Sequence, residues 1–243
     1  MKHSISLTVI SIKMSACIFA LIQLLQVGAP GATKTWKATF GGPGMDYGTA
    51  VIPAGDGGYV LTGVAGTANP DDSNVILIKV DLKGNKIWEK TYGGNLDDIA
   101  SYVARASDGG FIIAGRTKSY GAKANDILLV KTDADGIEQW HRMYGGKGDD
   151  FAANVIEVDD GYIIGGSTDS DAIGDYNLAI LKVDKQGTLL WQKKFDGDKI
   201  ENDGFVARAG DGGFLLVGST HSYGKGAADI WLIKTDEEGG TDK

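Results

Sequence analysis

The sequence is poor in the residue types that most often carry chemistry. Among 243 residues it has four prolines, three histidines and a single cysteine, Cys17. One thiol cannot form a disulfide within the chain, so stability must come from packing. His3, His141 and His221 are not at ligand spacing, which argues against a zinc site.

Patterns typical of common enzyme folds are missing as well. There is no G-x-S-x-G nucleophile elbow. No apolar period of 3.6 residues is found beyond the N-terminal leader, so no helix is expected to present a phosphate-binding loop. The net charge of -8 disfavours a nucleic-acid partner. These absences favour a non-enzymatic protein without excluding an enzyme.

The N-terminal segment is typical of a secretory signal peptide. Lys2 and Lys13 precede an apolar run over residues 14–27, and small residues follow it. This run is shorter than the ~20 residues of a membrane-spanning helix. We therefore expect a mature chain without a membrane span that is secreted, periplasmic or at the cell surface.

Cleavage is expected after Gly31 or Ala32, which divides the chain into a signal peptide, residues 1–32, and a repeat domain, residues 33–243. Cys17 leaves a lipid anchor open as an alternative. An apolar stretch follows this cysteine where a lipoprotein has a polar tether, so we prefer the cleaved signal peptide.

What the sequence has in abundance is glycine, with 37 residues, and internal repetition. Four tryptophans recur at intervals of 52, 52 and 51 residues, and another aromatic residue follows each by four positions. The two series are Trp36, Trp88, Trp140 and Trp191, and Phe40, Tyr92, Tyr144 and Phe195. A fixed period near 50 residues predicts a repeat architecture.

Each copy contains four short runs rich in Val, Ile, Tyr and Trp and bounded by Gly, Asp and Asn. In the second copy the runs are residues 101–106, 111–117, 126–133 and 138–144. Short glycine-containing segments connect them as hairpins. We predict an all-β fold, a β-propeller of four four-stranded blades, with the repeat aromatics between neighbouring blades.

The two ends of the repeat region suggest how the blades close. Residues 36–40 read as a fourth strand, and the last copy runs to Asp236 without a fourth strand of its own. The N-terminal strand is therefore expected to complete the last blade. The alternative is a structural module of a larger or dimeric propeller, with self-association into an eight-bladed ring as one form.

The phrases "SDGGFIIAGRTKSYG", "NDILLVKTDADG" and "WEKTYGG" resemble the secreted β-propeller repeat of bacterial and archaeal surface proteins. They are similar to the group described as seven-bladed β-propeller repeats. The resemblance covers residues 36–236 and implies a secreted or surface-associated binding protein. It transfers no catalytic residue to this chain.

Four acidic residues occupy one position of the repeat, six residues after the second aromatic: Asp46, Asp98, Asp150 and Glu201. In a propeller they would surround the channel mouth, where carboxylates could hold calcium or serve an extracellular hydrolase or lyase. A second interpretation needs no ligand, because each acid can cap a turn by accepting backbone N–H bonds. We prefer the cap, and otherwise expect no cofactor.

Three tyrosines, Tyr120, Tyr176 and Tyr223, lie in the connections between second and third strands. They could contact a protein or glycan partner on this loop face, or pack on their own loops. Residues 167–177, "STDSDAIGDYN", depart from the repeat consensus and are the better candidates for a function that the copies do not share.

Charged residues also recur on the strands. Each copy has a lysine two residues before an aspartate on the third strand, which predicts a structural Lys–Asp contact on one strand face. The lysines are Lys79, Lys131, Lys182 and Lys234. Arg105 and Arg208 occupy equivalent first-strand positions and could neutralise the acids of the channel.

Overall fold

A computed structural model describes residues 35–69, 72–169 and 174–242. The predicted signal peptide and Cys17 lie outside these residues. The chain from Trp36 onward forms one compact unit by its contacts, and the description below concerns this unit. None of its described segments is a helix long and apolar enough to cross a membrane.

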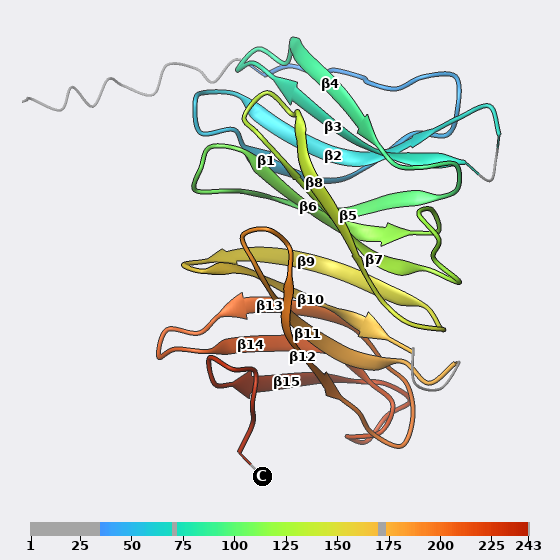
Figure 1. The fold of residues 1–243 in the computed structure, drawn as a ribbon, viewed down its shortest axis with the longest axis vertical. Coiled ribbons are helices and arrows are strands. Elements are labelled where there is room, and N and C mark those ends of the chain that lie inside the picture. The colour runs from blue at the N-terminus through green and yellow to red at the C-terminus, as the bar shows by residue number, and fades with distance from the viewer. Residues whose placement is uncertain (1–34, 70–71, 170–173, 243) are drawn as a thin grey trace, which may run out of the picture. The chain divides into compact units, whose positions relative to one another are not determined.

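The described residues of this unit form fifteen strands in four antiparallel sheets, each built from consecutive strands (Figure 1). The first sheet contains β1 (Tyr47–Pro53), β2 (Tyr59–Gly66), β3 (Ser73–Val80) and β4 (Lys86–Tyr92). The second contains β5 (Asp98–Arg105), β6 (Phe111–Thr117), β7 (Asp126–Thr132) and β8 (Glu138–Tyr144). The third contains β9 (Asp150–Val158), β10 (Gly161–Thr168), β11 (Asn177–Asp184) and β12 (Leu189–Phe195). The last contains β13 (Glu201–Arg208), β14 (Phe214–Thr220) and β15 (Asp229–Thr235).

The all-β prediction is confirmed, and most strand limits in the second copy agree to within a residue. The first strand of that copy begins earlier than predicted, at Asp98, because the acid that caps the preceding turn is already paired in the ladder. Hairpins join the strands, as their glycine-containing connections indicated.

Each sheet packs on the next through the same repeat positions. The first core contains Val60 and Leu77 of the first sheet together with Phe111 and Val130 of the second. The second and third cores repeat this arrangement between the following pairs of sheets. The hydrophobic interior is thus a series of similar layers, each formed by two neighbouring copies.

The repeat aromatics of β4, β8 and β12 lie in these layers, as predicted. The ring centroids of Trp88 and Phe111 are 6.2 Å apart at 60°, and those of Trp140 and Tyr162 are 6.2 Å apart at 61°. The Tyr92 hydroxyl donates to the carbonyl of Gly136 in the next sheet at 2.7 Å. Each fourth strand therefore contacts the sheet that follows it in the chain.

The first strands of the sheets neighbour one another, β1 beside β5, β5 beside β9, and β9 beside β13. Each of them has an irregularity near its start in the pairing with the second strand. Ser101 and Ala153 are the extra residues in β5 and β9, and β13 has a wider irregularity at Asp203 and Gly204. Such bulges bend a strand and redirect its side chains.

The predicted closure by the N-terminal strand is not observed. Residues 36–46 form no strand, and the last sheet has three strands. Trp36 packs on Tyr59 of the first sheet, with ring centroids 6.3 Å apart, and the first and last sheets lie at opposite ends of the array (Figure 1). The contacts of Trp36 hold this segment to the first sheet, far from β15.

Candidate functional site

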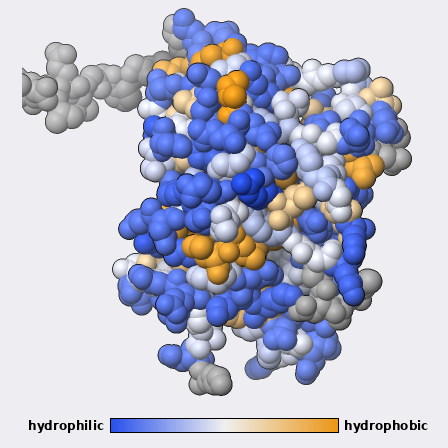
Figure 2. Space-filling model, in the orientation of Figure 1, coloured by the Kyte–Doolittle hydropathy of each residue, from blue (hydrophilic) through white to orange (hydrophobic). Residues whose placement is uncertain are grey.

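A cleft of about 340 Å³ opens where the bulged first strands of the second, third and fourth sheets meet. It is lined by residues from five strands and one connection, among them Ser101, Arg116, Phe151, Tyr176, Asn202 and Asp203. Its volume falls in the usual range for small-ligand sites, about 300–1,000 Å³. The face of the molecule shown in Figure 2 is mainly hydrophilic, with separate apolar patches.

The bulges bring polar side chains to this cleft. Ser101 of β5 and Asp203 of β13 are polar bulge residues that line the cleft. Ala153 of β9 is a bulge residue that also lines it. Asp203 has a φ of 61°, one of two positive values among the described residues other than glycine. Its backbone N–H donates to the Ser167 hydroxyl at 3.1 Å. Backbone in this region costs about 1–3 kcal/mol and often marks functional sites.

An aromatic pair forms one wall of the cleft. The rings of Phe151 and Tyr176 stack at 5.8 Å with an interplanar angle of 18°. The guanidinium carbon of Arg116 lies 5.1 Å from the centroid of Phe151. This contact holds the planar cation against the aromatic wall. The cleft therefore combines a flat apolar surface with a cation at Arg116, a carboxylate at Asp203 and neutral polar groups.

Hydrogen bonds behind the wall fix its orientation. The Tyr176 hydroxyl donates to Asp149 at 3.2 Å, and Asn125 donates to the same carboxylate from its backbone at 2.9 Å and its side chain at 2.6 Å. Burial opposes the charge of Asp149, but the hydrogen bonds from Asn125 and Tyr176 and the charge of Arg116 together lower the pKa of this carboxyl. Burial and the charge of Asp149 raise the pKa of Tyr176 to about 12, so its hydroxyl stays protonated.

The four acids of the repeat cap turns, which confirms the preferred interpretation. In every copy the carboxylate accepts the backbone N–H of the residue four positions earlier. The pairs are Gly42 to Asp46 at 2.8 Å, Gly94 to Asp98 at 2.6 Å, Gly146 to Asp150 at 3.0 Å and Gly197 to Glu201 at 2.9 Å. The last three of these acids are buried, and they position the turns that enter β5, β9 and β13.

Two of the acids are also bonded to hydroxyl groups. Asp98 accepts hydrogen bonds from Thr117 and, at 2.8 Å, from Ser119. Glu201 accepts equivalent bonds from the same two strand positions of the last copy. Within the part of the chain that the structure describes, no three acidic, histidine or cysteine side chains are grouped as metal ligands. The repetition of these acids therefore needs no ligand to explain it.

The third copy differs from its neighbours at this turn, because Asp126 lies beside Asp150. Burial, and then the charge of Asp150, raises the pKa of Asp126. One Asp126 oxygen is buried without a hydrogen-bond partner. Two other copies have an asparagine, Asn74 or Asn177, at the repeat position of Asp126. The aspartate at this position therefore brings a second carboxyl group beside the capping acid, which an asparagine does not.

The other two loop tyrosines lie outside the cleft. Tyr120 stacks on His141 at 4.4 Å. Tyr223 packs on Trp231 at 4.8 Å and donates to the carbonyl of Asp196 at 3.1 Å. The contacts of these two residues agree with packing on their own surroundings, whereas Tyr176 lines the cleft.

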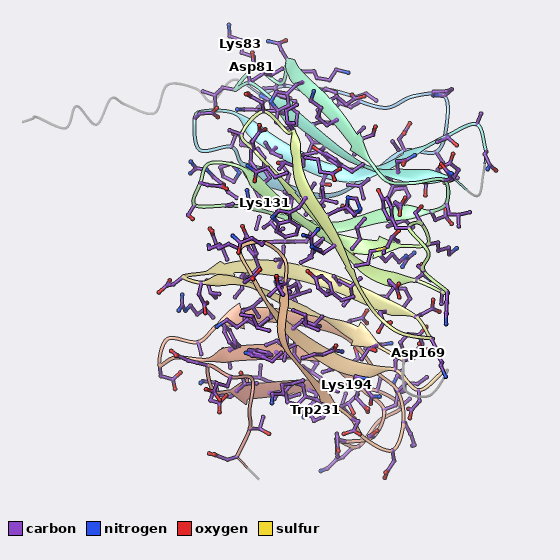
Figure 3. The ribbon with its side chains drawn as sticks, in the orientation of Figure 1. Asp81, Lys83, Lys131, Asp169, Lys194 and Trp231 are labelled. Atoms are coloured by element: carbon purple, nitrogen blue, oxygen red, sulfur yellow. The ribbon has the colours of Figure 1, made fainter. Side chains whose placement is uncertain are left out.

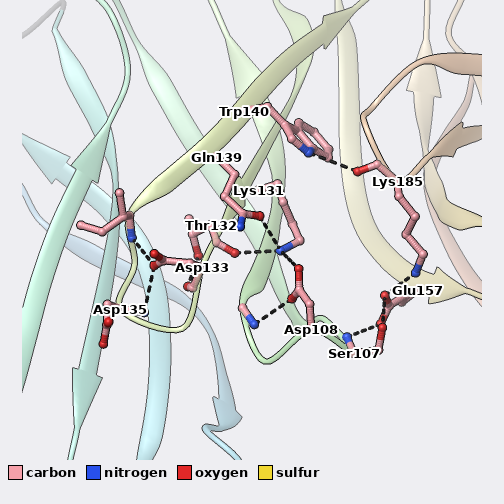
Figure 4. Close-up of polar contacts among 12 residues, drawn as sticks. Ser107, Asp108, Lys131, Thr132, Asp133, Asp135, Gln139, Trp140, Glu157 and Lys185 are labelled. Atoms are coloured by element: carbon pink, nitrogen blue, oxygen red, sulfur yellow. Dashed lines mark hydrogen bonds and ion pairs between the residues drawn. The ribbon is translucent and has the colours of Figure 1, made fainter.

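The predicted partner of the repeat lysines was wrong. Each lysine pairs with the aspartate of the first hairpin, as Lys131 does with Asp108 at 2.7 Å (Figure 4). The other pairs are Lys79–Asp56, Lys182–Asp160 and Lys234–Asp211. The aspartate two residues after the lysine, Asp133 in this copy, instead accepts the N–H groups of Asp135 and Ile137 in its own turn.

The two arginines do not approach the capping acids. Asp98 begins β5 and Arg105 ends it, so about 23 Å of strand separates them. Arg105 lies beside Gly55 of the preceding hairpin, and Arg208 lies 3.7 Å from Asp159. Both therefore lie at the hairpin end of the strands. Lys131 marks that end in Figure 3, and Asp169 marks the end with the cleft.

Sequence reasoning selected Tyr176 but missed Arg116, Phe151 and the polar residues of β13. A position-by-position comparison of the four copies could have identified two of these residues, because each departs from the residue type of its counterparts. Arg116 stands where the other copies have Val64, Ser167 and Ser219. Asp203 stands where they have Gly48, Ala100 and Ala152. A charge at a position that is otherwise small or uncharged indicates a role that the repeat does not share.

No protein-family model matches the sequence. The chain is similar to the regulatory protein FlaEY of Caulobacter vibrioides, with 26% identity over 228 residues. The match covers 79% of this chain and 24% of FlaEY, so this chain spans about a quarter of the length of that relative.

Proposed function

We propose that this chain is a non-enzymatic binding protein of the β-propeller class that holds a glycan in the cleft at Arg116, Phe151 and Tyr176. The observation that carries the proposal is the stacked aromatic pair, which lines a cleft of about 340 Å³ together with a guanidinium. A sugar ring has an apolar C–H face that suits an aromatic surface.

The polar groups around the rings fit the rest of such a ligand. Arg116 supplies N–H donors that match a sugar carboxylate or a pair of hydroxyl groups. Ser101 and Asn202 offer a hydroxyl and an amide on the neighbouring strands. Asp203 also lines the cleft, where its carboxylate can accept hydrogen bonds from hydroxyl groups but would repel an anionic ligand, so we expect preference for a neutral, hydroxyl-rich saccharide.

The propeller assignment is supported by four sheets of similar strand order and by first strands that neighbour one another. Secretion or attachment at the cell surface is supported by the apolar leader sequence. The name of FlaEY gives only a regulatory role for that protein. A binding module inside a larger regulatory protein is compatible with this name.

The alternative of an extracellular hydrolase or lyase depends on the four acids at the channel mouth. Each of these carboxylates is used as a turn cap, and Asp98 accepts three hydrogen bonds. The acids thus give a reaction no specific support, whereas the cleft gives binding a site with named groups.

A glycan array of neutral and acidic saccharides, followed by calorimetric titration of the best binder, tests the proposal. Tyr176→Ala and Arg116→Ala should each weaken binding about tenfold or more, which corresponds to about 1.4 kcal/mol. Tyr223→Ala is the matched control, because it removes a loop tyrosine outside the cleft. No binder on the array, or equal losses in Tyr176→Ala and Tyr223→Ala, would contradict the proposal.

A further inference from the structure

The last sheet presents an apolar face that is covered in the other three sheets. Ile230 and Leu232 on β15 are 85% and 63% exposed. Their counterparts in the second sheet, Ile127 and Leu129, are 2% and 0% exposed because the third sheet packs on them. We call the side of the last sheet that carries Ile230 and Leu232 the forward face.

The outer edge of β15 is also unpaired within the described residues. In the first three sheets the third strand pairs with a second strand on one side and a fourth strand on the other. β15 pairs with β14 alone. An open edge of this kind is a template for another strand.

The missing element exists at the opposite end of the array, in residues 36–40. Trp36 Nε1 donates to the carbonyl of Leu82 at 3.0 Å, as Trp140 Nε1 of a fourth strand donates to Lys185 at 3.2 Å. The ring centroids of Trp36 and Tyr59 are 6.3 Å apart, with an interplanar angle of 53°. This geometry is close to that of Trp88 and Phe111, whose centroids are 6.2 Å apart at 60°. Residues 36–40 thus contact the first sheet as a fourth strand would, without a sheet of their own.

The first sheet also has the face that receives a neighbour. Leu61, Ile76 and Ile78 occupy the repeat positions that bind the preceding sheet in later copies. Here Phe40 packs beside them, and a cleft of about 260 Å³ remains. This side of the first sheet, the receiving face, is therefore complementary to the forward face by the same contacts that join sheets inside the chain.

We propose that the forward face and β15 edge of one copy bind the receiving face and residues 36–40 of a second copy. Residues 36–40 become the fourth strand of the partner's last sheet. The ladders inside the chain predict the register of this pairing. In the second sheet, Ile127 lies opposite Tyr144 and Lys131 opposite Trp140. At the joint, the equivalent residues would place Ile230 opposite Phe40 and Lys234 opposite Trp36.

A joint of this kind is head-to-tail, so copies add in one direction and either close into a ring or extend. The occupant is a second copy because the contacts already occur three times within one chain. This inference is independent of the ligand in the cleft, since it involves other residues.

Sedimentation of the purified, processed chain over a wide concentration range tests the proposal. The wild-type chain should reach at least twice the monomer mass. One variant, Ile230→Asp with Leu232→Asp, disables the forward face. A second, Ala38→Pro with Thr39→Pro, removes two adjacent N–H donors, and one of them faces β15 in either orientation of the strand. All four positions are exposed, so the fold should persist, which circular dichroism will verify.

Each variant alone should stay monomeric, since each lacks one half of the joint. An equal mixture should form dimers and nothing larger, because the intact edge of one variant can accept the intact segment of the other. A monomeric wild-type chain would overturn the proposal. So would a mixture that remains monomeric, or variants that associate as the wild type does.

Discussion

At the scale of single residues, the turn before β9 differs from its counterparts because two carboxyl groups meet there. Asp126 and Asp150 lie together in a partly buried turn, and Asp126 has an oxygen without a hydrogen-bond partner. The raised pKa of Asp126 means that its folded form binds a proton more tightly than its unfolded form. The charged residue therefore destabilises the fold at neutral pH, and this cost is absent once the pH falls below the ordinary carboxyl range.

Replacing Asp126 by Asn should stabilise the protein by about 1 kcal/mol at neutral pH, because an amide can donate to Asp150. The gain should vanish below about pH 4, where the aspartate is itself protonated. Urea unfolding at both pH values measures the difference. Asp229→Asn is the matched control: its carboxylate accepts the N–H groups of Lys225 and Gly226, so that variant should gain nothing.

At the scale of elements, the turn caps link each sheet to the next. Asp98 holds the turn before β5 to Thr117 and Ser119 at the end of β6. Asp46, in the first copy, is less buried and accepts two backbone N–H groups, from Gly42 and Gly66. Deep burial makes an unmet hydrogen bond more costly, so equivalent caps should differ in energy.

Asp98→Ala should lower the free energy of unfolding by about 3 kcal/mol, since three donors, two of them buried, lose their acceptor. Asp46→Ala should cost about 1 kcal/mol or less, as is typical of a partly exposed cap. Denaturant unfolding of the two variants gives the comparison. Equal losses would show that the hydroxyl bonds of Asp98 contribute little.

Most of these elements could be predicted from the sequence, because strand runs and turn glycines are local signals. The partner of Lys131 could not, since Asp108 comes next to it only through the pairing of β6 with β7. The cleft itself was not predicted, although one of the predicted loop tyrosines, Tyr176, lines it. Tyr176 stood out in a loop that departs from the repeat, whereas Arg116 became a site residue only when bulged strands from three sheets were placed together.

At the scale of the whole molecule, the three large hydrophobic cores lie between neighbouring sheets, and Tyr102 of the second sheet also meets Phe205 of the fourth, with ring centroids 5.8 Å apart. Repeat arrays of this kind have stability that sums over local interfaces. The third sheet has cores on both sides, and the last sheet has one. Closure of the ring could not be read from the repeat, because the same strand pattern serves a closed ring and an open array.

Hydrogen exchange should therefore be faster in β15 than in its counterparts β3, β7 and β11, when measured in a solution dilute enough to hold single copies. The forward face of β15 is exposed and one edge is unpaired, whereas those three strands pair on both sides. Mass spectrometry of peptic fragments resolves these strands. Equal protection of all four sheets in single copies would contradict an open array.

The cleft is the feature on which the proposed function depends, and its occupancy can be mapped directly. An NMR titration of the isotope-labelled protein with the saccharide that binds best on the array locates the contact. The expected result is a set of shifted signals at Phe151, Tyr176 and Asn202, with the hairpin end around Lys131 unchanged. Shifts confined to the Lys131 end, or no shifts at saturating saccharide, would contradict a glycan site in this cleft.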